Sequence, residues 1–101
     1  MMKLAVCGVG RTGSELLRAI EESDRFLLTT AFCRPGSEKA DMDVGTLLNR
    51  NKTGVLIRDA SLMEQTLRDT PTDVVIDFST PAAARALLRA CKGHRTNIVF
   101  C

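Results

Sequence analysis

Short apolar runs alternate along the chain with segments whose apolar residues recur at helical spacing. Residues 3–7 form a compact apolar run, which is typical of a strand buried on both faces. Between residues 12 and 22, Leu16, Leu17 and Ile20 recur at the period of an amphipathic helix. The chain is therefore predicted to begin with a strand followed by a helix.

The same alternation continues to the last residue. Apolar and β-branched side chains predict four further strands, at residues 26–32, 55–58, 73–78 and 97–101. The polar stretch between residues 35 and 53 carries one apolar patch, formed by Val44, Leu47 and Leu48, which predicts a short helical turn.

Two more helices are predicted in the second half of the chain. The first covers residues 61–68, and its buried side is expected to hold Leu62, Met63, Thr66 and Leu67. The second follows the sequence Ser-Thr-Pro at residues 79–81, which supplies a hydroxyl for the N-cap and a proline for the first helical position. Its buried side is expected to hold Leu87, Leu88 and Cys91, and the helix is expected to end at Gly93.

This order of elements predicts an α/β fold of Rossmann type, with a doubly wound, mostly parallel five-stranded sheet and helices on both faces. Residues 1–101 then form one dinucleotide-binding domain. Residues 98–101 are apolar, are expected to lie inside the sheet, and have no polar tail after them. We therefore expect the sequence to be a fragment of a longer protein.

Composition and charge narrow the classes of function. The 101 residues are 45% hydrophobic and 26% charged, an ordinary balance for one globular domain. A net charge of +2, without a Lys/Arg run, predicts no nucleic-acid partner. No apolar stretch approaches the ~20 residues that span a bilayer, and no signal-peptide core precedes the first glycines. We expect a cytoplasmic protein without a membrane partner.

No metal site is predicted, because the cysteines form no Cys-x-x-Cys pair and have no histidine near them in sequence. They are expected to be reduced thiols, at Cys7, Cys33, Cys91 and Cys101. The single histidine, His94, has no orienting partner in the sequence and is expected to be a surface residue without a catalytic role.

Residues 8–13 read GVGRTG and match the G-x-G-x-x-G pattern of dinucleotide-binding turns. The pattern directly follows the first predicted strand and precedes the first helix, which is the context that gives it meaning. Gly8 permits the tight turn, Gly10 lets the backbone approach a pyrophosphate, and Gly13 lets the helix pack closely. The phosphates are expected at the positive end of the helix, where Arg11 can pair with them. The alternatives are a glycine turn without a ligand and a solvated Arg11.

The end of the second strand usually carries an acidic residue that binds the ribose 2′-hydroxyl of NAD. Here the sequence is Phe32-Cys33-Arg34, so no carboxylate is available and Arg34 could accept a 2′-phosphate instead. We therefore predict NADPH or NADH as cofactor, with NADPH favoured. A plain turn role for Arg34 is the alternative.

The glycine loop, the sequence DVVIDFSTP at residues 73–81 and the sequence KTGV at residues 52–55 together resemble the N-terminal domain of 4-hydroxy-tetrahydrodipicolinate reductase, an enzyme of lysine and diaminopimelate biosynthesis. The family typically shows Gly-Arg-Met-Gly in the loop and Asp-Val-Val-Ile-Asp-Phe-Thr/Ser-x-Pro later. The resemblance covers nearly the whole chain and implies that the parent protein is an NAD(P)H-dependent reductase.

The resemblance implies that the glycine loop holds the pyrophosphate, that Cys33 and Arg34 flank the adenosine ribose, and that Phe78 and Ser79 lie near the nicotinamide. Asp77 is expected to fix its loop by hydrogen bonds. No catalytic residue is predicted. The candidate cofactor-binding residues are Gly8, Val9, Gly10, Arg11, Thr12, Gly13, Cys33, Arg34, Phe78 and Ser79.

The sequence departs from the family pattern in several places. Its loop is one residue shorter than Gly-x-x-Gly-Arg-Met-Gly, Thr12 replaces the methionine, and Cys33 replaces an acid. The family's Gly-Thr-Thr-Gly segment and its second domain, with a His-His motif and a catalytic lysine, do not occur in these residues. Since the family is commonly tetrameric through that domain, the parent is expected to be a homo-oligomer. Because the catalytic motifs lie in the same domain, this chain alone is expected to be inactive.

Other functions share this sequence pattern. Dehydrogenases acting on diaminopentanoate, aspartate or homoserine have a similar cofactor domain. A regulatory nucleotide-sensing module, of the kind attached to ion channels or transcriptional repressors, needs no catalytic half. A coenzyme A-binding domain shares the fold and a similar glycine loop. Competition among NADPH, NADH, ADP and coenzyme A would discriminate among these functions.

Overall fold

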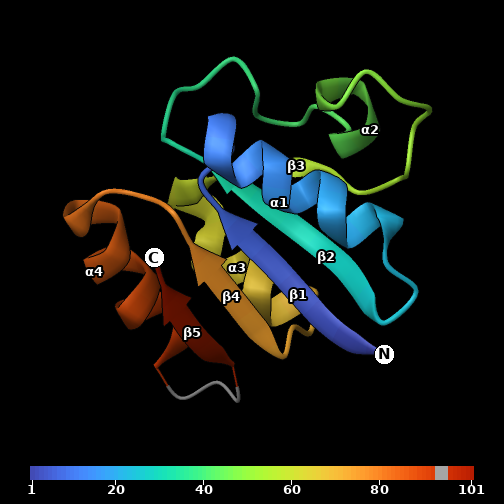
Figure 1. Ribbon diagram of the computed structural model, residues 1–101. Helices are drawn as coiled ribbons and strands as arrows, with labels where there is room; N and C mark the ends of the chain where they lie inside the picture. The colour runs from blue at the N-terminus through green and yellow to red at the C-terminus, as the bar shows by residue number, and fades with distance from the viewer. Residues whose placement is uncertain (93–95) are drawn as a thin grey trace.

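A five-stranded parallel sheet with the order β3-β2-β1-β4-β5 forms the centre of the computed structural model, which describes residues 1–92 and 96–101 (Figure 1). Its strands are β1 (Met2–Cys7), β2 (Phe26–Cys33), β3 (Ile57–Asp59), β4 (Val74–Asp77) and β5 (Asn97–Phe100). The helices are α1 (Arg11–Glu22), α2 (Val44–Leu47), α3 (Met63–Asp69) and α4 (Pro81–Cys91), with a 3-10 turn η1 (Ala60–Leu62) before α3. The predicted doubly wound α/β architecture is confirmed.

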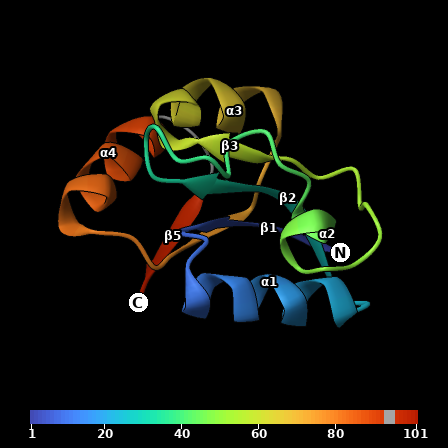
Figure 2. The same cartoon turned by 90° about the horizontal axis from the view of Figure 1, so that it is seen from above.

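Helices cover both faces of the sheet and divide the core into two layers (Figure 2). Strand β1 shows the division, because its side chains alternate between the faces. Leu4 and Val6 join the cluster under α1 and α2, while Ala5 and Cys7 join the cluster under α3 and α4. A strand buried on both faces reads as a continuous apolar run, which is why the sequence of β1 shows no polar alternation.

Strand β2 contains an irregularity that the sequence does not reveal. In the pairing with β1, Leu4 lies opposite Leu28 but Ala5 lies opposite Thr30, so Thr29 is an extra residue. Its Oγ1 donates to the carbonyl oxygen of Leu4 at 3.1 Å. One inserted residue changes the face that each later side chain meets, and Phe32 therefore lies in the layer under α3 and α4.

The third strand is shorter than predicted, because residues 55 and 56 pair with another segment. The N–H of Val44 donates to the carbonyl of Val55 at 2.8 Å, and Asp43 forms an isolated antiparallel bridge with Leu56. Only Ile57–Asp59 remains for parallel pairing with β2. The prediction of a strand over residues 55–58 is corrected accordingly.

Asp43 organises this connection. Its Oδ1 accepts hydrogen bonds from the N–H groups of Gly45 (2.7 Å) and Thr53 (2.9 Å), and its Oδ2 accepts one from Gly54 (2.8 Å). The Thr53 N–H makes the largest contribution to holding the pKa of Asp43 below its usual value, against the opposing effect of burial. One buried carboxylate thus links the start of α2 to the segment before β3.

Two of the predicted buried stripes contain wrong members. Leu62 is 42% exposed and lies in η1 rather than on the buried side of α3, which is formed by Met63 and Leu67. Leu88 is 53% exposed, whereas Leu87 and Cys91 are buried as predicted. The predicted end of α4 at Gly93, and the surface position predicted for His94, lie outside the described residues.

Among the strands that the structure describes, β5 lies at the edge of the sheet and pairs with β4 alone, so the prediction that residues 98–101 lie inside the sheet is wrong. Val99 and Phe100 are each 49% exposed. Among the described residues, none of the helices combines the length and the apolar character that a membrane crossing requires.

Replacing Asp43 by Asn is expected to lower the urea midpoint of unfolding, because an amide cannot accept all the N–H groups that the carboxylate accepts. A carboxyl with a lowered folded-state pKa adds stability that is complete above its unfolded pKa and is lost as pH falls through the folded value. The difference between wild type and Asp43→Asn should therefore shrink as the pH is lowered below about 4. The exposed Asp24→Asn serves as control, and a pH-independent difference would contradict this role of Asp43.

The four thiols are expected to differ in reactivity toward iodoacetamide at neutral pH. Burial raises the pKa values of Cys7 (to about 12), Cys33 and Cys91, whereas Cys101 is exposed. Since the thiolate is the nucleophile, the three buried thiols should react roughly tenfold or more slowly than Cys101. Timed alkylation with peptide mass spectrometry measures this, with the urea-unfolded chain as control. Equal rates in the folded chain would show that the three thiols are accessible.

Candidate functional site

The glycine loop lies at the carboxyl edge of the sheet, between the two strands that flank β1. From β1 the chain runs through the loop and α1 to β2, which pairs with one side of β1, while β4 pairs with the other side. The Gly8 N–H donates to the carbonyl of Phe32 at 2.9 Å, and the Phe78 N–H donates to the carbonyl of Cys7 at 2.8 Å. In open parallel sheets, ligands bind at such a switch point.

Two of the three loop glycines are required by the backbone itself. Gly8 has a φ of +104°, a conformation that side chains disfavour. A Cβ at Gly13 would stand 1.8 Å from the carbonyl oxygen of Gly8, so only glycine allows α1 to lie this close to the loop. Gly10 differs, since a Cβ there would meet nothing within 4 Å and would point into open space.

The first turn of α1 is open to an anion. Its N-cap residue is Gly10, which supplies no side-chain acceptor, and the carbonyl of Gly10 accepts the N–H of Ser14 at 2.8 Å. The N–H groups before Ser14 are those that an α-helix leaves without an intrahelical partner. Arg11 and Thr12 are exposed beside them. This end of the helix therefore offers N–H donors and a positive dipole in one place.

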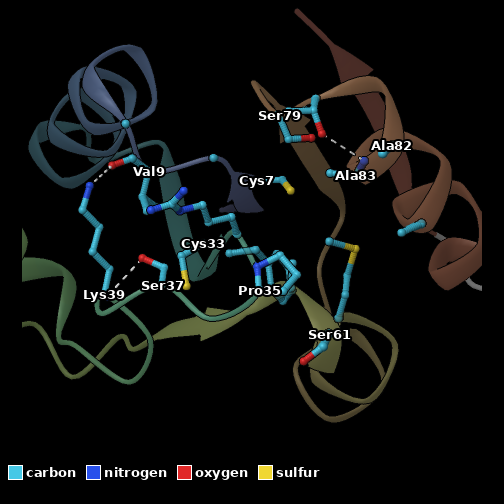
Figure 3. Close-up of a pocket in the computed structure, with 18 residues that line it drawn as sticks. Cys7, Val9, Cys33, Pro35, Ser37, Lys39, Ser61, Ser79, Ala82 and Ala83 are labelled. Atoms are coloured by element: carbon cyan, nitrogen blue, oxygen red, sulfur yellow. Dashed lines mark hydrogen bonds between the residues drawn. The ribbon is translucent and has the colours of Figure 1, made fainter.

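A cavity of about 680 Å³ opens in front of the loop (Figure 3). One wall is the loop itself, and a second is the end of β2 and the segment after it, with Cys33 and Ser37. A third wall is η1 and the start of α3, and a fourth is the turn after β4, with Ser79, and the start of α4. The lining residues are Cys7, Gly8, Val9, Gly10, Phe32, Cys33, Arg34, Pro35, Ser37, Lys39, Ala60, Ser61, Met63, Ser79, Thr80, Ala82, Ala83 and Ala86.

The lining of this cavity is mostly apolar, and its charged side chains are cations. Arg34 and Lys39 contribute to it, and no aspartate or glutamate among the described residues does. The nearest acid in the sheet register is Asp59, which lies opposite Cys33 at the end of β3. Its oxygens accept the N–H groups of Gly36 and Ser61, both at 2.9 Å, and the first of these bonds contributes most to lowering the pKa of Asp59.

The turn after β4 is held by Asp77, which is 3% exposed. Its Oδ1 accepts the N–H of Ser79 at 2.8 Å and also the hydroxyl of Ser79. Thr80 then caps α4 by accepting the N–H of Ala83 at 3.2 Å, with Pro81 in the first helical position. The expected loop-fixing hydrogen bonds of Asp77 and the predicted N-cap are both present. Burial, and then the charge of Asp77, raises the pKa of Cys7 beside this turn.

The structure brings six of the ten predicted site residues together around the cavity, namely Gly8, Val9, Gly10, Cys33, Arg34 and Ser79. The other four do not line it. Arg11, Thr12 and Gly13 form the first turn of α1, and the side chain of Phe78 packs against the core cluster under α1. A contact between Phe78 and a cofactor stays a prediction.

The prediction from sequence also missed lining residues. Lys39 lies in the polar stretch after β2, where no periodicity or motif marked it. Ala83 and Ala86 follow the Ser-Thr-Pro signal, and the apolar face of their helix could have identified them. Among residues 1–92 and 96–101, no three His, Cys, Asp or Glu side chains gather in a way that could hold a metal ion.

Gly13→Ala is expected to destabilise the fold by about 2 kcal/mol or more, because its methyl group would overlap the Gly8 carbonyl and move α1 off the loop. Gly10→Ala is the matched control in the same loop, since Gly10 has a φ of −75° and space for a methyl group. It should cost about 1 kcal/mol or less. Urea unfolding of both variants tests this, and similar stabilities would contradict the close approach.

The fold is shared with solved proteins, one of which was determined with a nicotinamide dinucleotide. RSP, a Rex-family repressor solved with β-NAD⁺ and operator DNA, matches with a TM-score of 0.67 and 15% identity over 100% of this chain and 51% of that chain. A meso-dapdh mutant of Clostridium tetani E88, solved with DAP, matches with a TM-score of 0.60 and 19% identity over 99% of this chain and 27% of that chain. At these identities the likeness shows a common fold.

Sequence relatives point to one family. Proteins named 4-hydroxy-tetrahydrodipicolinate reductase match at 33% identity in Methanothermobacter thermautotrophicus (98% of this chain, 37% of the relative) and at 34% in Pseudoalteromonas atlantica (99% and 36%). The chain thus spans a little over a third of the length of these curated relatives. A family model described as "Dihydrodipicolinate reductase, N-terminus" matches residues 2–101. Together with the glycine loop and the turn after β4, this match shows that the chain belongs to the dihydrodipicolinate reductase family, as its N-terminal part.

Proposed function

We propose that the chain binds a nicotinamide dinucleotide in the cavity at the carboxyl edge of its sheet, as the cofactor domain of a dihydrodipicolinate reductase-like enzyme. The observation that carries the proposal is the position of the cavity, which joins the glycine loop, the end of β2 and the turn after β4. These are the places where a Rossmann-type sheet meets the pyrophosphate, the adenosine ribose and the nicotinamide.

The residues present fit such a cofactor. Gly10 leaves open space where any side chain would stand, beside N–H donors that receive no side-chain cap. A pyrophosphate placed there would be held by the backbone and the helix dipole. Arg34 and Cys33 would lie on the adenosine side and Ser79 on the nicotinamide side, so the cavity has room and chemistry for both ends of a dinucleotide.

We propose further that NADPH binds at least as well as NADH. Discrimination for NADH usually needs a carboxylate directed at the ribose 2′-hydroxyl. The acid nearest this position, Asp59, does not line the cavity and already accepts two backbone N–H groups. A 2′-phosphate would instead meet the positive charge of Arg34.

The parent protein is proposed to reduce 4-hydroxy-tetrahydrodipicolinate, the substrate in the names of its relatives. The bound nicotinamide would supply the hydride, while this chain would bind and orient the cofactor. The chain alone is expected to show no turnover, because the family's second domain, with its His-His motif and catalytic lysine, does not occur in these residues. Assembly into a homo-oligomer, and work in the cytoplasm on lysine biosynthesis, belong to the same proposal.

A nucleotide-sensing function finds less support. The repressor that shares the fold is 15% identical to this chain, whereas relatives named as the reductase are 33–34% identical. The STP sequence at residues 79–81 forms the cap and first residue of α4 and places Ser79 and Thr80 on the cavity. It is part of the candidate site, and nothing in the described residues favours operator DNA as a partner.

Titration of the chain with NADPH and NADH, followed by nicotinamide fluorescence, tests the proposal. Wild type should bind both, with NADPH at least as tight. Arg34→Ala should weaken NADPH about tenfold and NADH much less, the size expected for a lost charge-assisted hydrogen bond. Arg68→Ala, an exposed change on α3, is the matched control.

Gly10→Ala should weaken both cofactors, since its methyl group would enter the space assigned to the pyrophosphate. Absence of binding to both cofactors in wild type would overturn the proposed function. A clear NADH preference that Arg34→Ala leaves unchanged would overturn only the proposed preference for NADPH.

A further inference from the structure

Lys39 reaches the glycine loop from the segment that follows β2. Its Nζ donates to the carbonyl oxygen of Val9 at 3.0 Å, and its backbone N–H donates to Ser37 Oγ at 3.2 Å (Figure 3). The Val9 carbonyl also accepts the hydroxyl of Ser14 at 3.1 Å. The half-buried Lys39 side chain therefore links two walls of the cavity and holds its ammonium group at a defined point.

Among the described residues, no carboxylate forms an ion pair with this ammonium group. Within the part of the chain that the structure describes, no ion pair involves Lys39 or Arg34, and no acid lines the cavity they share. An ammonium group has three N–H donors, and the carbonyl of Val9 is its hydrogen-bond acceptor here. A half-buried cation bound to a neutral oxygen retains donors and charge for an anionic ligand.

NADPH carries two anionic groups, the pyrophosphate and the 2′-phosphate. The position of Lys39 indicates which of them its ammonium group would contact. The pyrophosphate is expected at the first turn of α1, where backbone N–H groups serve it. Lys39 comes from the same segment as Arg34, on the side of the loop that faces the end of β2 and the ribose. Its ammonium group is thus on the side where a 2′-phosphate differs from a 2′-hydroxyl.

Resting on the proposed dinucleotide function, we propose that Lys39 is a specificity-determining residue. Its ammonium group and the Arg34 guanidinium form a two-cation site for the 2′-phosphate of NADPH. The two cations differ in kind, because Arg34 is exposed and planar while Lys39 is half-buried and already held by Val9. A cation held in place before binding loses less freedom when the phosphate arrives.

Dissociation constants of Lys39→Met for NADPH, NADH, 2′,5′-ADP and 5′-ADP, measured by calorimetry at constant ionic strength, test the proposal. Methionine keeps an unbranched side chain and removes the charge. NADPH and 2′,5′-ADP should bind about tenfold or more weakly, and NADH and 5′-ADP should change less than about threefold. Lys92→Met, an exposed change at the end of α4, is the matched control and should leave all four constants unchanged.

Lys39→Arg should keep most of the NADPH preference, because it keeps a cation in this place. In Arg34→Ala/Lys39→Met, the ratio of NADPH to NADH affinity should fall to about one or below. Urea unfolding of each variant shows whether the fold is retained. If Lys39→Met is unfolded, Lys39→Arg is the deciding variant. Loss of the preference for NADPH over NADH in folded Lys39→Arg would contradict the cation site.

Equal weakening of NADPH and NADH by Lys39→Met would overturn the proposal in favour of a loop-positioning or pyrophosphate role. Unchanged constants for all four ligands would overturn it as well. In both cases wild type still binds a dinucleotide, so the proposed function would stand. If wild type binds none of the four, the proposed function itself fails.

Discussion

The backbone of α1 lies against the carbonyl group of Gly8 at a distance that one methyl group on Gly13 would make impossible. This contact places the first turn of the helix directly behind the loop, so that its N–H groups and the loop meet at the same edge of the sheet. The positive φ of Gly8 gives the chain the sharp turn that the contact needs. The cavity, the uncapped first turn of α1 and the open space beside Gly10 all depend on this approach.

Carboxylates hold the surrounding segments in place. Asp77 accepts N–H and O–H groups of the turn after β4, Asp59 joins the segment after β2 to η1, and Asp43 joins α2 to the segment before β3. Each of these carboxylates accepts hydrogen bonds from backbone N–H groups, and none of them lines the cavity. The acids of this region thus stabilise the walls, while the exposed Arg34 and the half-buried Lys39 line the cavity. The charged side chains on the cavity lining are therefore cations, which is the charge that the proposed dinucleotide needs.

The succession of strands and helices along the chain could be predicted because local sequence carries its signals. The apolar run of β1, the Ser-Thr-Pro cap of α4 and the glycine spacing each act within a few residues. The errors have a physical cause as well. Leu62 and Leu88 are as apolar as their buried neighbours, and only the packing of η1 and α4 against the sheet exposes them. The bulge at Thr29 depends on the partner strand and leaves no local signal.

The sequence by itself determined the α/β class, the position of the glycine loop and the likeness to one reductase family, because each rests on residues close together in the chain. Tertiary structure decided which of those residues share a cavity. It set Phe78 against the core, engaged Asp59 with backbone N–H groups, and brought Lys39 to the carbonyl of Val9 across thirty positions of sequence. Such contacts depend on how separate segments meet at the edge of the sheet, and no local pattern of residues encodes that meeting.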